Sequence, residues 1–104
     1  MADDDYAEAV LDLVAAIPPG RAMTYGLVAE VLAEQLGRGG PRQVGHVLAR
    51  RGGGVPWWRV VNSSGAAPAP YAADAQGRWH DEGTPLTADG ERVALRRAVW
   101  WPES

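Results

Sequence analysis

Two breaks rich in glycine and proline constrain the fold more than any other feature of the sequence. Pro18-Pro19-Gly20 and Gly37-Arg38-Gly39-Gly40 interrupt what would otherwise be one long helical region. Proline removes a backbone donor, and glycine loses more conformational freedom than other residues when it enters a helix. Apolar residues recur at helical spacing from Asp3 to Ile17, before the first break. The sequence therefore predicts short helices packed together rather than one long helix.

The segment between the two breaks is predicted to be the second helix. Thr24 is a suitable N-cap, and the helix is expected to run to about Leu36 with one apolar face, made of Leu27, Val28, Val31 and Leu32. Arg21-Ala22-Met23, just before it, is long enough only for a small strand. Tyr25 would occupy the first helical position, beside exposed backbone N–H groups that suit a phosphate. A tyrosine at a helix start is also common without such a role, so both interpretations stay open.

A third helix is predicted to begin at Pro41, where the missing N–H of proline does no harm. Val44, Val47 and Leu48 share one face of this helix. The opposite face carries small residues flanked by polar and basic ones, namely Arg42, Gln43, Gly45, His46, Ala49 and Arg50. Such a surface fits a groove in nucleic acid, with the arginines at phosphates or base edges. A solvated helix face is the alternative, and His46 is expected to be an exposed polar residue rather than a general base.

The charge distribution supports the nucleic-acid interpretation better than the net charge does. The 104 residues carry a net charge of -3, which disfavours a phosphate-rich partner. From Arg21 to Arg59, however, there are six arginines and two glutamates, and six minus two leaves a local charge of +4. The acidic residues gather near the two ends of the sequence.

Length and residue content restrict the remaining function classes. A chain of 104 residues is expected to form one domain, over residues 1–104. It has no cysteine, which excludes disulfides, thiolate metal sites and a cysteine nucleophile, and it has only two histidines. We therefore expect no metal and no cofactor. No apolar run approaches the roughly 20 residues of a membrane span, and the acidic start is unlike a signal peptide, so we expect a cytoplasmic monomer, nucleoid-associated if bacterial.

Two adjacent tryptophans stand at the centre of the chain, in Pro56-Trp57-Trp58-Arg59-Val60-Val61. The β-branched residues predict a short strand, closed by a turn over Asn62-Ser63-Ser64-Gly65. In a strand, Trp57 and Trp58 would point to opposite faces, one into the core and the other into a cleft. Indoles dominate core packing, so the alternative is that both tryptophans are structural.

The remainder of the chain is predicted to pack against this centre. Residues 66–70 form a loop, 76–82 form one or two helical turns ended by Gly83, and 85–93 form a hairpin about Ala88-Asp89-Gly90. The apolar tail over 98–102 is expected to fold back as a clamp, with a partner-binding patch as the alternative.

Three motifs, in the same order and at the same spacing, resemble the O6-alkylguanine-DNA alkyltransferases. Ile17-Pro18-Pro19-Gly20 with Thr24-Tyr25-Gly26-Leu27-Val28-Ala29 resembles the entry to the helix-turn-helix of that family, and Pro41-Arg42-Gln43-Val44-Gly45 resembles its Ala-Arg-Ala-Val-Gly recognition-helix start. Pro56-Trp57-Trp58-Arg59-Val60 resembles the active-site Pro-Cys-His-Arg-Val, with tryptophan at both the cysteine and the histidine. This is similar to the alkyltransferase-like proteins, non-enzymatic relatives without the acceptor cysteine.

The resemblance, which runs from about Ile17 to Gly83, implies a mixed α/β (α+β) fold, a winged-helix-like domain with a helix-turn-helix. It implies that Tyr25 rotates the phosphate of the target nucleotide and that Arg42 fills the space left by a flipped base. The implied pocket for the damaged base consists of Tyr25, Pro56, Trp57, Trp58, Arg59, Val60, Ser63 and Tyr71. The implied partners are duplex DNA containing O6-alkylguanine and then the proteins of nucleotide excision repair.

Two departures from the family pattern affect this expectation. The asparagine usual in the family near Arg51 is absent, which puts the turn before Pro56 in doubt. The family's glutamate that orients the active-site histidine aligns with Glu82, and with Trp58 in place of the histidine Glu82 is expected to lose that partner.

Two other function classes remain open from the sequence. A winged-helix regulator would share the helix-turn-helix and the arginines, but would bind undamaged DNA. An enzyme of altered chemistry would need a nucleophile, for which Ser63 and Ser64 are the nearby candidates.

Overall fold

The computed structural model describes the backbone of residues 2–102 and the side chains from Asp5 onward. Met1, Glu103 and Ser104, which complete the domain expected over 1–104, lie outside the described residues. The main elements in chain order are α1 (Ala2–Ala16), β1 (Met23–Thr24), α2 (Tyr25–Leu36), α3 (Pro41–Arg51), β2 (Val60–Val61), α4 (Ala72–Glu82) and α5 (Leu95–Ala98). Three short 3-10 turns lie between them: η1 (Gly52–Gly54), η2 (Trp57–Arg59) and η3 (Ala69–Tyr71).

The first three helices form where the two breaks predict them. The Thr24 hydroxyl oxygen accepts a hydrogen bond from the backbone N–H of Leu27 at 2.9 Å, which confirms the N-cap. Gly37 ends α2 in the left-handed conformation, with φ of 73°, and Pro41 occupies the first turn of α3. The three helices share one apolar core that includes Val10, Val14, Val28, Leu32 and Val44. Helix packing therefore fixes the direction in which α3 presents its outer face.

A parallel pair of two-residue strands joins the halves of the chain. Met23 pairs with Val60, and Thr24 pairs with Val61. The tail extends this arrangement, because the backbone N–H of Trp100 donates to the carbonyl of Ala22 at 2.9 Å. Val99 and Trp100 pack against the core. The predicted apolar clamp is thus confirmed for these two residues, while Trp101 remains 59% exposed.

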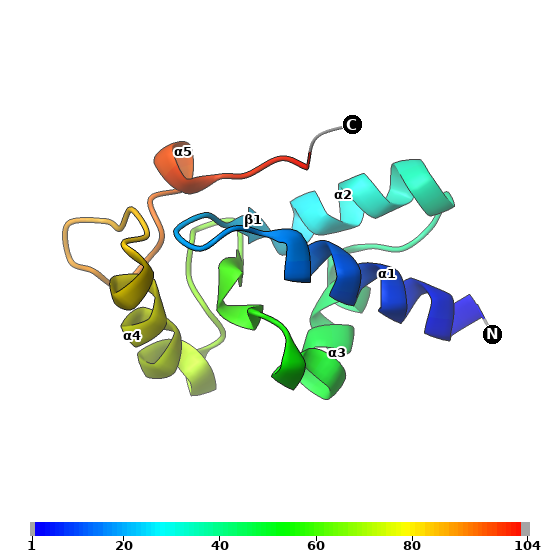
Figure 1. Ribbon diagram of the computed structural model, residues 1–104, viewed down its shortest axis with the longest axis horizontal. Helices are drawn as coiled ribbons and strands as arrows, with labels where there is room; N and C mark the ends of the chain where they lie inside the picture. The colour runs from blue at the N-terminus through cyan, green and yellow to red at the C-terminus, as the bar shows by residue number, and fades with distance from the viewer. Residues whose placement is uncertain (1, 103–104) are drawn as a thin grey trace.

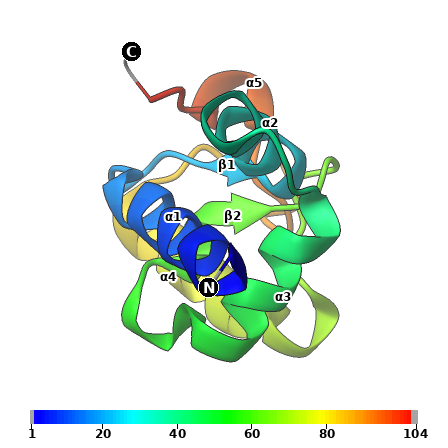
Figure 2. The ribbon, with the colours of Figure 1, turned by 90° about the vertical axis from the view of Figure 1, so that its right-hand side faces the viewer.

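The elements are arranged along a long axis, and the principal extents are 42 × 28 × 20 Å. Figure 1 shows α1, α2 and α3 toward one end of this axis and α4 at the other, with the chain that follows α3 running between them. Figure 2 shows both strands in the middle, with α2 and α5 above them. A second apolar cluster underlies α4 and includes Ala75, Trp79, Val61 and Val93. The segment that carries Trp57 and Trp58 therefore lies between two cores.

The predicted hairpin over residues 85–93 is present, with one antiparallel bridge. Leu86 and Val93 make an antiparallel bridge, and the N–H of Thr87 donates to the carbonyl of Arg92 at 2.9 Å. The hairpin docks on Gly65, whose carbonyl accepts from the N–H of Val93 at 2.8 Å. Gly65 has φ of 88°, and a Cβ there would overlap the carbonyl of Val93. Glycine at this position is therefore required by both conformation and space.

The prediction of a strand through Trp57 and Trp58 is wrong. The N–H of Arg59 donates to the carbonyl of Pro56 at 3.0 Å, so the two tryptophans lie in the 3-10 turn η2, and only Val60 and Val61 are extended. β1 offers only two residues for pairing, so a local turn satisfies the backbone that a longer strand would have left unpaired. The two indoles do not face opposite ways; they meet edge to face, with ring centres 5.6 Å apart.

Two further boundaries differ from the expectation. α4 begins at Ala72 rather than Gln76, and it ends as predicted at Gly83, whose φ is 70°. Residues 52–54, which the sequence analysis assigns to no element, form a 3-10 turn with Gly52 buried.

Candidate nucleic-acid interface

The outer face of α3 is the basic, low-relief surface that the sequence predicts. Val44 is buried, and Val47 and Leu48 pack against the core, so the opposite face points outward. Arg42, Gln43, His46, Ala49 and Arg50 are exposed, and Gly45 is half-buried. A Cβ at Gly45 would meet open space, so no side chain covers the middle of the helix.

The basic groups on this face have no acidic partner. Within residues 5–102, no carboxylate lies within ion-pair distance of Arg42, His46 or Arg50. The neighbouring Arg51 extends from the helix to Glu8 on α1, with a nitrogen–oxygen distance of 3.7 Å. The unpaired groups leave positive charge available for phosphates.

Tyr25 occupies the first position of α2, as predicted. Its side chain is half-buried and packs against the helical core. This burial raises the pKa of the Tyr25 hydroxyl, which therefore stays protonated at neutral pH and remains a hydrogen-bond donor.

Trp57 forms a wall of a cavity of about 380 Å³ beside α3. The helix side of the cavity consists of Gly45, Leu48 and Ala49, and the opposite side is closed by Pro68, Tyr71 and Asp74. The rings of Trp57 and Tyr71 are 5.8 Å apart at an angle of 59°. Tyr71, one of the residues of the implied pocket, thus lines this cavity, and small residues on α3 leave the cavity open toward the basic face.

Trp57 also lines a second cavity, of about 370 Å³. Pro56, Trp58 and Arg59 line this space together with Arg78 of α4. The guanidinium of Arg78 lies 4.3 Å from the ring centre of Trp58 and 5.9 Å from that of Trp57. Of the residues expected in one pocket, Pro56, Trp58 and Arg59 therefore line a different cavity from Tyr71, and Trp57 lines both.

The remaining expected pocket residues line neither cavity. Val60 is 1% exposed and belongs to the core, so its side chain is inaccessible to a ligand. It is buried because its position in β2 faces the three helices. Ser63 lies on the exposed turn after β2, and Tyr25 lies on α2.

The carboxylate of Glu82 accepts hydrogen bonds from several donors, one of which is the Trp58 indole. Its carboxylate accepts from the indole N–H of Trp58 at 3.0 Å, from two guanidinium nitrogens of Arg59, and from the backbone N–H of Gly20 at 3.2 Å. Glu82 has no histidine partner, as expected, but Trp58 replaces it as a donor, because an indole N–H donates just as an imidazole N–H does. Burial would raise the pKa of Glu82, but the hydrogen bonds from Arg59, Gly20 and Trp58 outweigh it and lower that pKa.

This arrangement is structural rather than a proton relay. The carboxylate stays charged, and the indole of Trp58 does not exchange a proton in the physiological range. A second indole reinforces the position, because the N–H of Trp79 donates to the carbonyl of Trp58 at 2.7 Å. Two residues of α4 therefore hold the η2 turn. Glu82 accepts from the side chain of Trp58, and Trp79 donates to the backbone carbonyl of Trp58.

Two residues that the sequence analysis did not single out are Asp74, which lines the cavity beside α3, and Arg78, which lines the second cavity. The two side chains form an ion pair at 3.1 Å between successive turns of α4. Their spacing of four residues is the usual signal for such a pair on a helix. This pair was not identified from the sequence because a helix is predicted only from Gln76, which leaves Asp74 outside it.

The described residues contain neither a membrane-spanning helix nor a cluster of metal-binding side chains. No helix between residues 2 and 102 is long and apolar enough to cross a membrane. The same part of the chain contains no group of three or more histidine and acidic residues that would hold a metal ion.

Comparison with known proteins places the chain in a family. Residues 5–83 match the model of the 6-O-methylguanine DNA methyltransferase DNA-binding domain. A DNA base-flipping protein of Escherichia coli (strain K12) is 44% identical over 102 residues, covering 94% of this chain and 76% of that protein. A DNA base-flipping protein of Vibrio parahaemolyticus is 30% identical over 103 residues, covering 95% of this chain and 99% of that protein.

Solved structures agree with this placement. The crystal structure of S. pombe ATL in complex with DNA matches with a TM-score of 0.75 and 30% identity, covering 95% of this chain and 97% of that chain. The structure of S. pombe Atl1 in complex with damaged DNA containing O6-carboxymethylguanine matches with the same TM-score, identity and coverage. The family match over residues 5–83, the sequence identity and the shared fold establish that this chain belongs to the alkyltransferase-like proteins, the family built on the DNA-binding domain of 6-O-methylguanine DNA methyltransferase.

Proposed function

We propose that this protein is a non-enzymatic sensor of O6-alkylguanine in duplex DNA, which flips the damaged base out of the helix and holds it against Trp57. The observation that carries the proposal is the 380 Å³ cavity, which opens beside the basic face of α3 and has an indole as its wall. The relatives named as base-flipping proteins and the Atl1 complex with damaged DNA support it.

Base extrusion is assigned to one residue at the start of each of two helices. α3 lies in the minor groove, and Arg42 enters the base stack where the flipped nucleotide was. Tyr25, whose hydroxyl is protonated, donates to the phosphate of that nucleotide. An alkyl group on O6 weakens base pairing, so the cost of extrusion is lower at a lesion than at an intact pair.

The cavity is suited to holding the base but not to removing the alkyl group. Stacking of a base on an aromatic side chain is worth about 1–3 kcal/mol. Alkyl transfer needs an activated nucleophile such as a thiolate, and the sequence contains no cysteine. The indole of Trp57 is no substitute, so the lesion stays on the DNA.

The alternative nucleophiles do not fit the geometry. The Ser64 hydroxyl donates to the Asn62 side chain at 2.7 Å, within a turn. Ser63 is exposed on the same turn and lines neither Trp57 cavity. We therefore favour a binding protein over an enzyme.

Affinity for two duplexes that differ only in a single O6-methylguanine tests the proposal, at matched salt because phosphate contacts dominate non-specific binding. We expect tighter binding to the methylated duplex by tenfold or more, with the methyl group still on the recovered DNA. Equal, salt-sensitive binding to both duplexes would favour a winged-helix regulator. Transfer of one methyl mass to the protein would establish an enzyme instead.

Two variants test the flipping mechanism directly. Tyr25→Phe and Arg42→Ala should each weaken binding to the methylated duplex sharply. Arg97→Ala is the matched control, since Arg97 is exposed on α5, away from α3. Unchanged affinity in both test variants would rule out extrusion by these residues.

Persistent binding without repair requires a second system to remove the lesion. We propose that the bound complex marks the site for nucleotide excision repair in the cytoplasm, or on the nucleoid if the cell is bacterial. Recovery of excision proteins with the lesion-bound form, and not with free protein, would test this assignment.

A further inference from the structure

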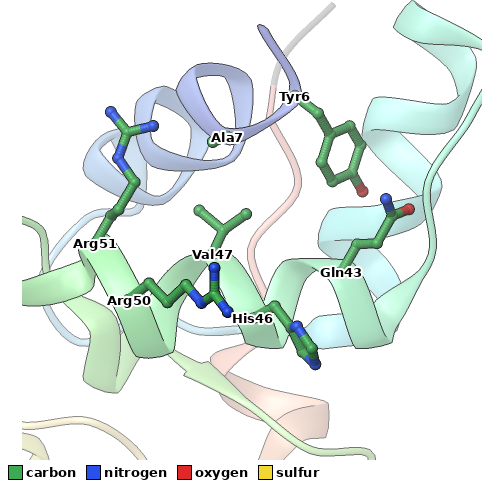
Figure 3. Close-up of a pocket in the computed structure, with 7 residues that line it drawn as sticks. All are labelled: Tyr6, Ala7, Gln43, His46, Val47, Arg50 and Arg51. Carbon is green, nitrogen blue, oxygen red and sulfur yellow. The ribbon is translucent and has the colours of Figure 1, made fainter. Parts of the chain in front are cut away.

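The recognition helix has a second hollow on the flank opposite the lesion cavity. A cleft of about 330 Å³ lies between α1 and α3. We call it the α1–α3 cleft; it is lined by Tyr6, Ala7, Gln43, His46, Val47, Arg50 and Arg51. Figure 3 shows Tyr6 directed from α1 toward α3, and Gln43, Val47 and Arg51 directed from α3 toward α1, with Arg50 lying along α3. The two hollows share no lining residue, so they can bind different parts of one ligand.

A buried hydroxyl lines this cleft. Tyr6 is 2% exposed, and its hydroxyl group has no hydrogen-bond partner among the side chains of residues 5–102 or the backbone of 2–102. A polar group buried in this way is destabilising until a partner is supplied. Figure 3 shows the hydroxyl directed toward the side chain of Gln43, which is exposed and free to turn. One rotation of the amide would let its oxygen accept from Tyr6 and leave its N–H groups facing the cleft.

Tyr6 packs closely against the loop between α2 and α3. Its ring lies against Gly39, where a Cβ would overlap the ring atoms, and the guanidinium of Arg38 sits 5.5 Å from the ring centre. Gly39 has φ of 98°, so the close approach depends on glycine. The hydroxyl is therefore fixed at the cleft by the loop between α2 and α3.

The charges of the cleft favour an anion. Arg50 and His46 are exposed, and neither has a carboxylate partner among residues 5–102. The nearby carboxylate of Glu8 is engaged by Arg51 at the rim. Val47 and Ala7 supply an uncharged floor. An anion bound there would meet hydrogen-bond donors around an apolar base.

We propose that the α1–α3 cleft binds a backbone phosphate of the same DNA duplex that α3 engages, an inference that rests on the proposed function. The minor groove is about 6 Å wide, whereas a helix with its side chains is about 10–12 Å across. A helix seated there contacts sugar–phosphate strands along its flanks. One flank of α3 borders the lesion cavity, so the other flank brings the cleft against the backbone.

The roles within the cleft follow from the donors. Arg50 donates to two phosphate oxygens, and the amide N–H of Gln43 donates to the phosphate while its oxygen accepts from Tyr6. These contacts are made to any duplex, because phosphates carry no sequence information. The cleft therefore supplies affinity that is independent of the lesion, and the Trp57 cavity supplies the preference.

Affinities of Arg50→Ala for the methylated and unmodified duplexes, measured at several salt concentrations, test this assignment. We expect affinity for both duplexes to fall by the same factor, the preference to stay unchanged, and the slope of log K against log salt to decrease by about 0.9. Arg97→Ala is the matched control and should leave the slope unchanged. An unchanged slope in Arg50→Ala, or a loss confined to the methylated duplex, would overturn the proposal.

The variant Tyr6→Phe tests the contribution of the Tyr6 hydroxyl separately from that of the Arg50 charge. This variant removes a buried unsatisfied group, so it should fold at least as stably as the wild type. It should bind both duplexes more weakly by a few-fold, with the salt slope unchanged, because no charge is removed. Wild-type affinity in Tyr6→Phe would overturn the role of the hydroxyl. If the wild type itself shows no lesion preference, the proposed sensor function fails, and the salt slope on the unmodified duplex still decides the cleft.

Discussion

The indole at position 57 combines a broad apolar surface with a lack of nucleophilic reactivity. It lines two cavities, one beside α3 and the other beside Arg78. Its ring centre lies 5.8 Å from that of Tyr71 and 5.9 Å from the guanidinium of Arg78. A side chain packed against such neighbours loses little further freedom when a base stacks on it, so more of the stacking energy appears as affinity.

Replacement of Trp57 should remove the preference for the methylated duplex while retaining the affinity for unmodified DNA. Trp57→Ala should weaken binding to the methylated duplex by about 1–3 kcal/mol, the stacking energy of one base, and leave affinity for the unmodified duplex unchanged. Fluorescence anisotropy with both duplexes measures this difference. Trp101→Ala, a change at an exposed tryptophan in the tail, is the control. An equal loss on both duplexes would show that Trp57 supports the fold of the interface rather than the lesion cavity.

Among the elements, α4 acts through Glu82 as the support of the η2 turn. The ion pair of Glu82 with Arg59 lies with 14% and 13% of the two side chains exposed. Arg59 also donates to the carbonyl of Ile17 at 2.8 Å. The hydrogen bonds of Arg59 therefore connect Glu82 of α4 to the residue just before Pro18-Pro19-Gly20. The position of Trp58, and with it that of Trp57, depends on this charged group.

The lowered pKa of Glu82 makes its contribution depend on pH. Glu82→Gln should destabilise the protein by about 3 kcal/mol near pH 7, because it leaves the Arg59 charge without its partner. The folded-state pKa lies below the unfolded value of about 4.3, so the contribution is present above that pH and is lost as the pH falls through the folded pKa. The stability difference between wild type and Glu82→Gln should therefore shrink below about pH 4.3. Denaturant unfolding across that range measures it, with the exposed Glu91→Gln as control; a constant difference would contradict this origin.

On the scale of the whole molecule, the two flanks of α3 divide the work of binding. The lesion cavity lies toward α4, and the α1–α3 cleft lies toward α1, with no lining residue in common. Figure 2 shows α1 and α3 side by side at the N-terminal end of the fold. A net charge of -3 is compatible with DNA binding in this arrangement, because Arg42 and Arg50 are exposed on the outer face of α3 and have no carboxylate partner among residues 5–102.

Separate sites should make separate contributions to affinity. The double variant Arg50→Ala, Trp57→Ala should lose, on the methylated duplex, the sum of the two single losses to within about 0.5 kcal/mol. The same titrations as for the single variants give the four affinities of the cycle. A coupling well above this limit would mean that one flank positions the other.

The sequence by itself determined the helices and the family. Breaks, caps and apolar spacing are local properties, so α1, α2 and α3 were predicted with boundaries close to those observed, and the three motifs identified the relatives. The basic face of α3 followed from the same helical periodicity. Residues 57 and 58 could not be predicted in this way, because their conformation depends on how many residues β1 offers for pairing.

Only the tertiary structure decided which side chains meet. Contacts between residues distant in the chain depend on the packing of whole elements, which no local pattern encodes. They placed Tyr71 and Asp74 across from α3, brought Glu82 to Trp58 and Arg59, and buried Val60 away from any ligand. They also brought Tyr6 to Gln43 and Arg50 in the α1–α3 cleft, because packing of α1 on α3 sets that distance.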